Sequence, residues 1–298
     1  MNIIDDIESV VLMKKGKLIA LGGTVGLLAT IFSVSPKSWH LSLAEWRGVL
    51  ISFFGITVTE SPIISPLIDP VVGIEMIFVK GGTFAMGCTA EQNNCSDDEK
   101  PVHNVTLNDF YLGKYEITQK QWEQVMANNP SKFKGDSLPV ENVSWNDARL
   151  FIATLNLMNT MAGKKYRFPT EAEWEYAARG GLKSSGYMYS GSNNINDVAW
   201  YESNSDDKTN HVETKIANEL GIYNMSGNVS EWVNDWYDKE YYQKSLQANP
   251  KGPNLGSGRV YRGGGWYLEA EHCRVSFRAN YAPNNHFEYL GFRLALSP

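Results

Sequence analysis

The chain has 298 residues, enough for one large domain or two smaller ones, and its apolar fraction of 43% is that of a packed globule. A net charge of −6 without a basic cluster argues against a nucleic-acid partner. Nine Trp and fifteen Tyr, with only 20% charged residues, favour an irregular, loop-rich domain over a helical bundle.

Three cysteines, Cys88, Cys95 and Cys273, are too few for a disulfide scaffold and have the wrong spacing for a zinc ribbon. Cys88 and Cys95 are close enough to bridge within one loop in an oxidising compartment. In a reducing compartment they would be two separate loop thiols. A zinc site that uses both with His103 lacks an evident fourth ligand.

Residues 1–70 differ in character from the rest of the chain. Residues 18–34 carry no charge and follow three lysines, which is the pattern of a membrane anchor at the short limit of about 17 residues. A second apolar stretch, residues 49–58, is long enough only for an interfacial helix. The alternative is an apolar helical segment packed inside a complex. Residues 60–70 contain three prolines and predict a linker.

We therefore expect two parts, an apolar N-terminal segment over 1–70 and a folded domain over 71–298. Within the domain, residues 76–79 and 81–87 predict two strands joined by a glycine turn, and His103–Leu107 and Phe110–Ile117 predict further strands. The expected localisation is at a membrane through residues 18–34, and otherwise the cytoplasm.

Three helices are predicted by their N-terminal caps. Thr118, Ser144 and Thr170 each have a side-chain acceptor three residues later, the spacing of a capping box. The third helix should stop at Gly180. The side chains expected to face the core are Ala148, Phe151, Ile152, Leu155 and Met158 in the second helix, and Trp174, Ala177 and Ala178 in the third.

The C-terminal segment alternates between two kinds of sequence. Residues 262–266, 273–276 and 291–293 have strong backbone demands and frame stretches without periodicity. The framed stretches are rich in aromatic, His, Asn and Glu side chains, which is the composition of a contact surface. The candidate ligand-binding residues are Tyr267, Leu268, Glu269, Glu271, His272, Phe277, Asn280, Tyr281, Asn284, Asn285, His286, Phe287, Glu288 and Tyr289.

Seven motifs together resemble the formylglycine-generating enzyme (sulfatase-modifying factor) family from about residue 74 to the end. They occupy residues 81–87, 115–118, 139–145, 167–180, 224–232, 262–266 and 291–293. The resemblance implies an α+β, C-type lectin-like fold of the formylglycine-generating-enzyme type, loop-rich and here preceded by the apolar helical segment.

The oxidase members of that family use two cysteines, two and seven positions beyond the Trp that matches Trp266, to bind copper as thiolates. Cys273 stands at the second position, but Leu268 stands at the first. Because a soft Cu(I) site needs two thiolates, this argues against copper and against a catalytic residue here. Cys273 would be catalytic only if the chain were an oxidase, and we expect it to be a small buried side chain.

The resemblance also implies a structural calcium ion. Its ligands would be the side chains of Asn224 and Glu231 and the carbonyl groups of Gly227 and Val229. All four offer hard oxygen atoms, as calcium requires. The alternative is the same loop closed by hydrogen bonds without a metal.

The C-terminus resembles even more closely the variable proteins of diversity-generating retroelements, which are bacterial or phage-encoded. In these proteins a segment between a GG-x-W motif and a terminal GFR is rewritten on a fixed scaffold. Asn280, Asn284 and Asn285 would be unmutated positions there, whereas the glutamates are less easily derived from Asn codons. This resemblance implies a non-catalytic protein that binds a protein or glycan ligand.

Three alternatives stay open. One is an accessory or structural relative of the enzyme family, and another is a copper-dependent oxidase. The third is a two-His, one-carboxylate iron site made by His272 and His286 with Glu271 or Glu288, whose geometry the sequence does not fix.

Overall fold

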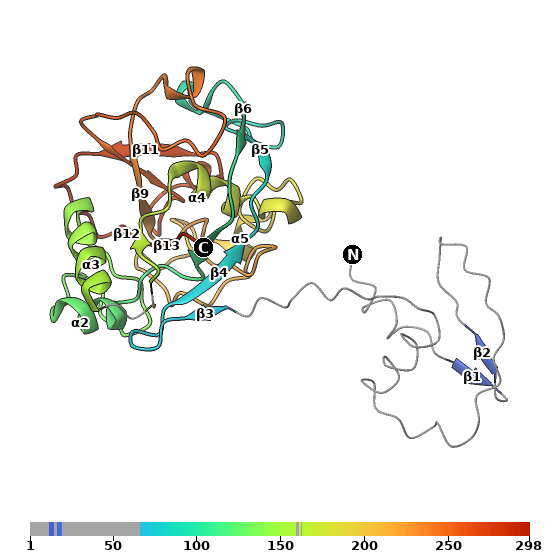
Figure 1. Cartoon of the computed structure of the whole chain (residues 1–298), viewed down its shortest axis with the longest axis horizontal. Coiled ribbons are helices and arrows are strands. Elements are labelled where there is room, and N and C mark those ends of the chain that lie inside the picture. The colour runs from blue at the N-terminus through green and yellow to red at the C-terminus, as the bar shows by residue number, and fades with distance from the viewer. Residues whose placement is uncertain (1–11, 15–16, 20–65, 159–160, 162) are drawn as a thin grey trace. The chain divides into compact units, whose positions relative to one another are not determined.

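The structure is a computed structural model that describes residues 12–14, 17–19, 66–158, 161 and 163–298 (Figure 1). The chain divides into two units, Met1–Ile63 and Ile64–Pro298. In the first unit, β1 (Leu12–Lys14) pairs antiparallel with β2 (Lys17–Ile19). The expected anchor begins in β2, and residues 20–34, the apolar stretch 49–58 and the linker up to residue 65 lie outside the described residues. Among the described residues, no helix is long and apolar enough to cross a membrane.

A five-stranded sheet joins the two ends of the second unit. Early and late strands meet in it because β7 pairs with β4 on one side and with β13 on the other. Its strands are, in spatial order, β3 (Leu67–Ile68), β4 (Glu75–Val79), β7 (Phe110–Gly113), β13 (Ala295–Leu296) and β8 (Tyr166–Arg167).

A four-stranded sheet carries the C-terminal segment. Its strands are, in spatial order, β11 (Arg278–Tyr281), β10 (Arg259–Arg262), β9 (Ser230–Trp236) and β12 (Leu290–Phe292). The strand β12 runs parallel to β9, while the other pairs are antiparallel. A separate hairpin, β5 (Thr83–Met86) with β6 (His103–Thr106), matches the predicted strands around the first glycine motif.

The three predicted helices are confirmed as α2 (Gln119–Met126), α3 (Trp145–Met158) and α4 (Glu171–Ala178). Thr118 and Thr170 form capping boxes, and the Ser144 hydroxyl accepts a hydrogen bond from the Asp147 amide. Helices α2 and α3 lie side by side at one end of the unit (Figure 1). The shorter helical turns are η2 (Asp97–Glu99), η3 (Gly181–Lys183), α5 (Ile195–Val198), η4 (Tyr241–Gln243) and η5 (Ala270–Cys273).

For one residue of α3, the prediction that its side chain faces the core is wrong. The predicted inward side chains of both helices are buried apart from Met158, which is 42% exposed. It is the last residue of α3, and its neighbour Leu157 is 86% exposed, so the final turn extends beyond the core. The core itself consists of one cluster that includes Trp122, Phe151 and Phe292 and a second cluster around Trp174 of α4.

Candidate functional site

Buried arginines hold the C-terminal segment, residues 262–293, in place. Each makes an ion pair with a buried glutamate from a distant part of the chain. The pairs are Arg262 with Glu175, Arg274 with Glu99, Arg278 with Glu171 and Arg293 with Glu231. Removing one partner of such a pair is strongly destabilising, since it leaves an uncompensated charge in the interior. The frame is therefore tied to the rest of the domain by charge pairing as well as by packing.

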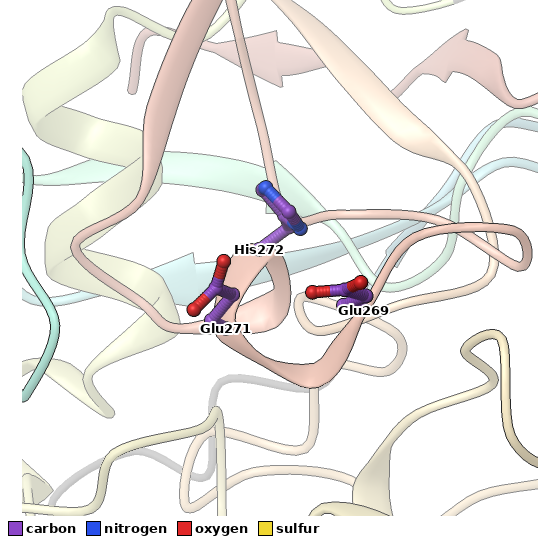
Figure 2. A group of neighbouring side chains, drawn as sticks. All are labelled: Glu269, Glu271 and His272. Atoms are coloured by element: carbon purple, nitrogen blue, oxygen red, sulfur yellow. The ribbon is translucent and has the colours of Figure 1, made fainter.

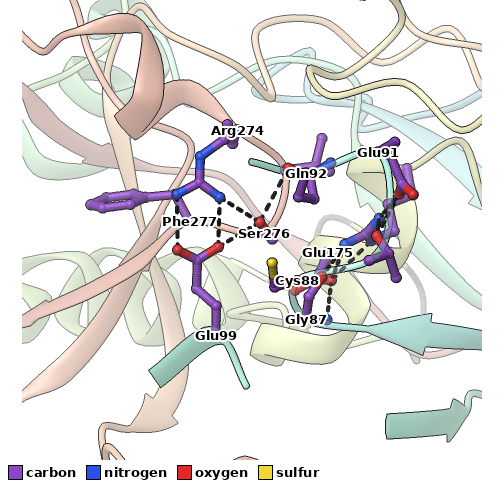
Figure 3. Close-up of polar contacts among 12 residues, drawn as sticks. Gly87, Cys88, Glu91, Gln92, Glu99, Glu175, Arg274, Ser276 and Phe277 are labelled. Atoms are coloured by element: carbon purple, nitrogen blue, oxygen red, sulfur yellow. Dashed lines mark hydrogen bonds and ion pairs between the residues drawn. The ribbon is translucent and has the colours of Figure 1, made fainter. Parts of the chain in front are cut away.

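Arg274 shows how these pairs are built (Figure 3). Its guanidinium donates to both oxygens of Glu99 at 2.7 and 2.8 Å, and the Ser276 hydroxyl donates to the same carboxylate. Burial alone would raise the pKa of Glu99, but the hydrogen bonds from Arg274 and Ser276 lower it below the ordinary value. The carboxylate therefore stays ionised.

The loop that precedes Glu99 contains a disulfide between Cys88 and Cys95. Of the two alternatives for these cysteines, the structure has the bridge, which leaves neither sulfur free to bind zinc with His103. Arg274 also donates to the Asn94 carbonyl group in this loop. The disulfide loop is thus held against the C-terminal frame.

Cys273 is the free cysteine of the described residues and is fully buried, as expected. A Cβ atom on Gly264 would come within 2.6 Å of its sulfur, and Gly264 has φ +70°. Burial raises the pKa of the Cys273 thiol to about 12, so it is protonated at neutral pH. The geometry places a neutral thiol under a glycine that no other residue can replace without strain.

Five aromatic side chains form a continuous row, which we call the aromatic ladder: Tyr261, Tyr281, Phe287, Tyr289 and Tyr267. Successive ring centroids lie 5.1, 4.5, 5.3 and 4.9 Å apart. The Tyr281 and Tyr289 hydroxyl groups are hydrogen-bonded at 2.9 Å. Tyr261 at one end of the row is buried, and Tyr267 at the other end is 49% exposed.

Tyr289 requires a correction, because it was expected on the exposed contact surface. Its side chain is only 9% exposed and is part of the core. The residue directly precedes β12, and its carbonyl group accepts a hydrogen bond from the Ser230 amide of β9 at 2.7 Å. Since the backbone is fixed to the sheet at this point, the ring packs against Phe287 and Tyr267, and only a small part of it stays exposed.

An open cavity of about 560 Å³ lies beside the exposed end of the aromatic ladder. The C-terminal segment contributes Tyr267, His286, Phe287, Glu288 and Tyr289 to its lining. The opposite wall is Lys132 and Asn142, from the segment that leads into α3. Lys132 forms an ion pair with Glu288 at 2.6 Å, and the Asn142 side-chain oxygen lies 3.0 Å from Nδ1 of His286.

The sequence reasoning missed Lys132 and Asn142. Asn142 has φ +62°, a backbone conformation that Asn tolerates better than most residues. It lies in the motif at residues 139–145, so the motif offered a signal, but nothing local indicated that this motif faces the C-terminal segment. The cavity thus combines an aromatic wall with a cation, a carboxylate, an amide and an imidazole.

The other predicted contact residues lie outside this cavity. Glu269, Glu271 and His272 form a separate cluster at η5 (Figure 2), and Phe277 packs against the His272 ring with centroids 4.9 Å apart. The remaining residues are Leu268, Asn280, Tyr281 and Asn285, which are half-buried, and exposed Asn284, which accepts a hydrogen bond from Asn146.

His286 is not among the donors that gather with His272. Its Nδ1 atom is directed to Asn142 on the wall of the cavity instead. Among the described residues, the two-His iron arrangement is therefore not assembled.

The expected calcium ligands have a mixed environment. Oδ1 of Asn224 is buried and has no hydrogen-bond partner among the described residues, which fits an oxygen that binds a cation. Glu231, however, already accepts hydrogen bonds from Arg293 on both oxygens and from Trp174, so a calcium ion would have to share it. Near them, burial raises the pKa of Glu116 to about 7, against the effect of Arg293. The fit is partial, and calcium stays a prediction.

The mixed fold, its long irregular loops and the framed C-terminal segment define a domain of the sulfatase-modifying type. Residues 69–298 match the family described as "Sulfatase-modifying factor enzyme 1-like domain", and the chain belongs to this family. The resemblance on which the expected fold rested is thereby confirmed.

Two relatives of known sequence match most of the chain. It is 34% identical to the chaperone protein LppX of Paenibacillus barcinonensis over 273 residues, which cover 76% of this chain and 90% of LppX. It is 29% identical to the formylglycine-generating enzyme of Streptomyces coelicolor, covering 72% of this chain and 87% of that protein.

Solved structures show the same fold. Treponema denticola variable protein 1 superposes with a TM-score of 0.71 and 32% identity, covering 80% of this chain and 100% of that one. PvdO from Pseudomonas aeruginosa superposes with a TM-score of 0.67 and 26% identity, covering 78% and 98%. The similarity to a variable protein that the C-terminus suggested is confirmed.

Proposed function

We propose that this chain is a non-catalytic protein that binds a protein or glycan ligand through residues 267–289. The observation that carries the proposal is the aromatic ladder, which runs from the buried ring of Tyr261 to the exposed ring of Tyr267 beside a cavity of about 560 Å³. Aromatic rings supply large contact area at little cost in rotamer entropy, because they have only two side-chain torsions.

The chemistry of the cavity suits a ligand that has both an apolar face and polar groups. Tyr267 offers an exposed ring for stacking, and His286 and the Lys132–Glu288 pair offer donors and acceptors at its rim. A sugar ring or an aromatic side chain of a protein meets these requirements. The buried frame fixes the surface before the ligand arrives, which reduces the entropy lost on binding.

The state of the thiols supports a non-catalytic role. Leu268 occupies the position at which the oxidases carry their first cysteine, so a copper-binding thiolate pair cannot form there. The remaining thiol, Cys273, is buried and has a pKa of about 12. A thiol that stays protonated at neutral pH is a poor metal ligand and a poor nucleophile.

Two of the similarities favour two versions of this role. Treponema denticola variable protein 1 matches over its whole length, which supports ligand binding through a variable surface. LppX is named a chaperone, which favours an accessory role as the second candidate. In either version, residues 18–34 would attach the domain to a membrane, and cell fractionation with and without these residues tests that attachment.

The experiment is a screen of glycans and displayed peptides against the full chain, repeated with Tyr267→Ala. The matched control is Leu255→Ala, because Leu255 is 84% exposed and lies outside the proposed binding surface.

A nearby near-copy of the DNA that encodes residues 263–293, differing at adenines and accompanied by a reverse transcriptase, would support diversification of the surface. Copper-dependent oxidation of a cysteine peptide would contradict the non-catalytic proposal.

A further inference from the structure

A second group of side chains lies at η5, outside the cavity. Glu269 precedes this turn, and its carbonyl group accepts a hydrogen bond from the His272 amide at 3.0 Å. In a 3₁₀ turn, residues three apart lie one above the other, which brings Glu269 next to His272. Figure 2 shows the two carboxylates and the imidazole together, and one donor atom from each of Glu269, Glu271 and His272 lies within 4.8 Å of the others.

The three side chains make no hydrogen bond or ion pair to other described residues that would compete with a metal ion. In the described part of the chain, neither carboxylate side chain has a hydrogen bond or ion pair to a protein group, although two glutamates so close together repel each other. The Nδ1 atom of His272 is buried and has no hydrogen-bond partner among the described residues. Buried nitrogen atoms are nearly always satisfied by a protein group, a water molecule or an ion. The His272 ring packs at about a right angle against the Phe277 ring, which helps to fix its orientation.

We propose that Glu269, Glu271 and His272 bind one divalent transition-metal ion of the zinc type. Calcium and magnesium take oxygen ligands, whereas a mixture of one imidazole with carboxylates suits zinc and its neighbours. Two carboxylates balance the charge of the ion. Bond lengths of about 2.0–2.2 Å place tetrahedral ligands about 3.3 Å apart. Because both glutamates are exposed, their side chains can rotate to reach that spacing.

Three protein ligands leave the fourth position of a tetrahedral ion open. A ligand held at the neighbouring surface would complete the site with an oxygen or nitrogen donor, since Glu269 follows Tyr267 by two residues. This consequence deepens the proposed function and rests on it. The binding of the ion itself does not depend on the proposed function.

The test is isothermal titration of the tag-free full chain with zinc chloride, with calcium in excess so that an oxygen-only site is already filled. We expect one ion per chain, and Glu271→Gln and His272→Gln should each weaken binding at least about tenfold. His286→Gln is the matched control, because it removes an exposed imidazole that lies outside the cluster. Cobalt(II) in place of zinc should give visible absorption bands that the Glu271→Gln variant loses.

Glu271 is exposed and has no hydrogen bond or ion pair to another described residue, so its replacement should leave the circular dichroism spectrum unchanged and keep the test valid. Absence of zinc binding, or equal affinity in the wild type and the Glu271→Gln variant, would overturn the inference. Loss of zinc binding in His286→Gln would also overturn it, because the ion would then lie at the cavity. The effect of Tyr267→Ala on ligand capture, measured with a chelator present, tests the proposed function separately.

Discussion

Replacing Arg293 with Met removes one of the buried ion pairs of the frame. The guanidinium is fully buried and donates to the two Glu231 oxygens at 2.6 Å each. It also donates to the carbonyl groups of Gly113 at 2.9 Å and Tyr223 at 2.8 Å. Met has a similar apolar length but no donor, so Glu231 would keep only its hydrogen bond from Trp174.

The expected loss in the free energy of unfolding is about 3–5 kcal/mol, the range for a buried carboxylate that loses its partner. For a domain of this size, each kcal/mol lowers the Tm by about 2–4 °C, so the Tm should fall by about 6–20 °C. The double change Arg293→Met with Glu231→Leu should recover much of the loss, since an apolar pair of similar volume removes both charges of the ion pair.

The assay is urea unfolding followed by tryptophan fluorescence. Lys80→Ala is the matched control, because Lys80 pairs with Asp109 at 2.9 Å but its side chain is 66% exposed, and it should cost less than about 1 kcal/mol. A similarly small loss for Arg293→Met, with an unchanged denaturant slope, would refute the role of the buried frame. So would a double variant that is less stable than the single one.

Three other predictions follow from the same geometry. A thiol reagent should leave Cys273 unmodified in the native protein and label one thiol per chain after denaturation, and rapid native labelling would contradict its burial. If the Asn224 oxygen helps to bind calcium, calcium at about 100 times its Kd should add about 2.7 kcal/mol of stability over a chelated sample. The Asn224→Ala variant should lose this gain. A wild-type Tm that calcium does not change would mean that hydrogen bonds alone close the loop. Burial raises the pKa of Glu141 in the folded state to about 7 from 4.5. The folded protein therefore binds the extra proton, and stability should fall by about 1–2 kcal/mol as the pH rises from 4.5 to 7. Glu141→Gln should flatten this decline, and an unchanged slope in thermal unfolding would contradict it.

The helix starts could be predicted from the sequence because a capping box is a local arrangement. Thr118 and Thr170 bond to residues three positions away, and no tertiary contact is needed to recognise them. Whether a side chain is buried depends on the rest of the fold, which is why the predicted burial of Met158 and the predicted exposure of Tyr289 were wrong. Met158 is the last residue of α3 and Tyr289 directly precedes β12, and at such boundaries periodicity no longer indicates the direction of the core.

Only one wall of the candidate site could be predicted from the sequence, for a related reason. Composition identified the aromatic segment, but the opposite wall depends on residues 132–142 meeting residues 286–289. That meeting is fixed by contacts such as the hydrogen bond from the Asn142 amide to the Phe287 carbonyl group at 2.9 Å. A single sequence contains no information on such distant pairs. The glutamate partners of the buried arginines could not be predicted from the sequence for the same reason.

The most direct measurement of the central claim is the affinity of a selected ligand for the wild type and for the Tyr267→Ala and Leu255→Ala variants. If the exposed end of the aromatic ladder is the binding surface, Tyr267→Ala should weaken binding by at least about 2 kcal/mol, roughly thirtyfold, at unchanged Tm. Leu255→Ala should bind as the wild type does. Ligands that bind the wild type and the Tyr267→Ala variant equally well would show that the binding surface lies elsewhere.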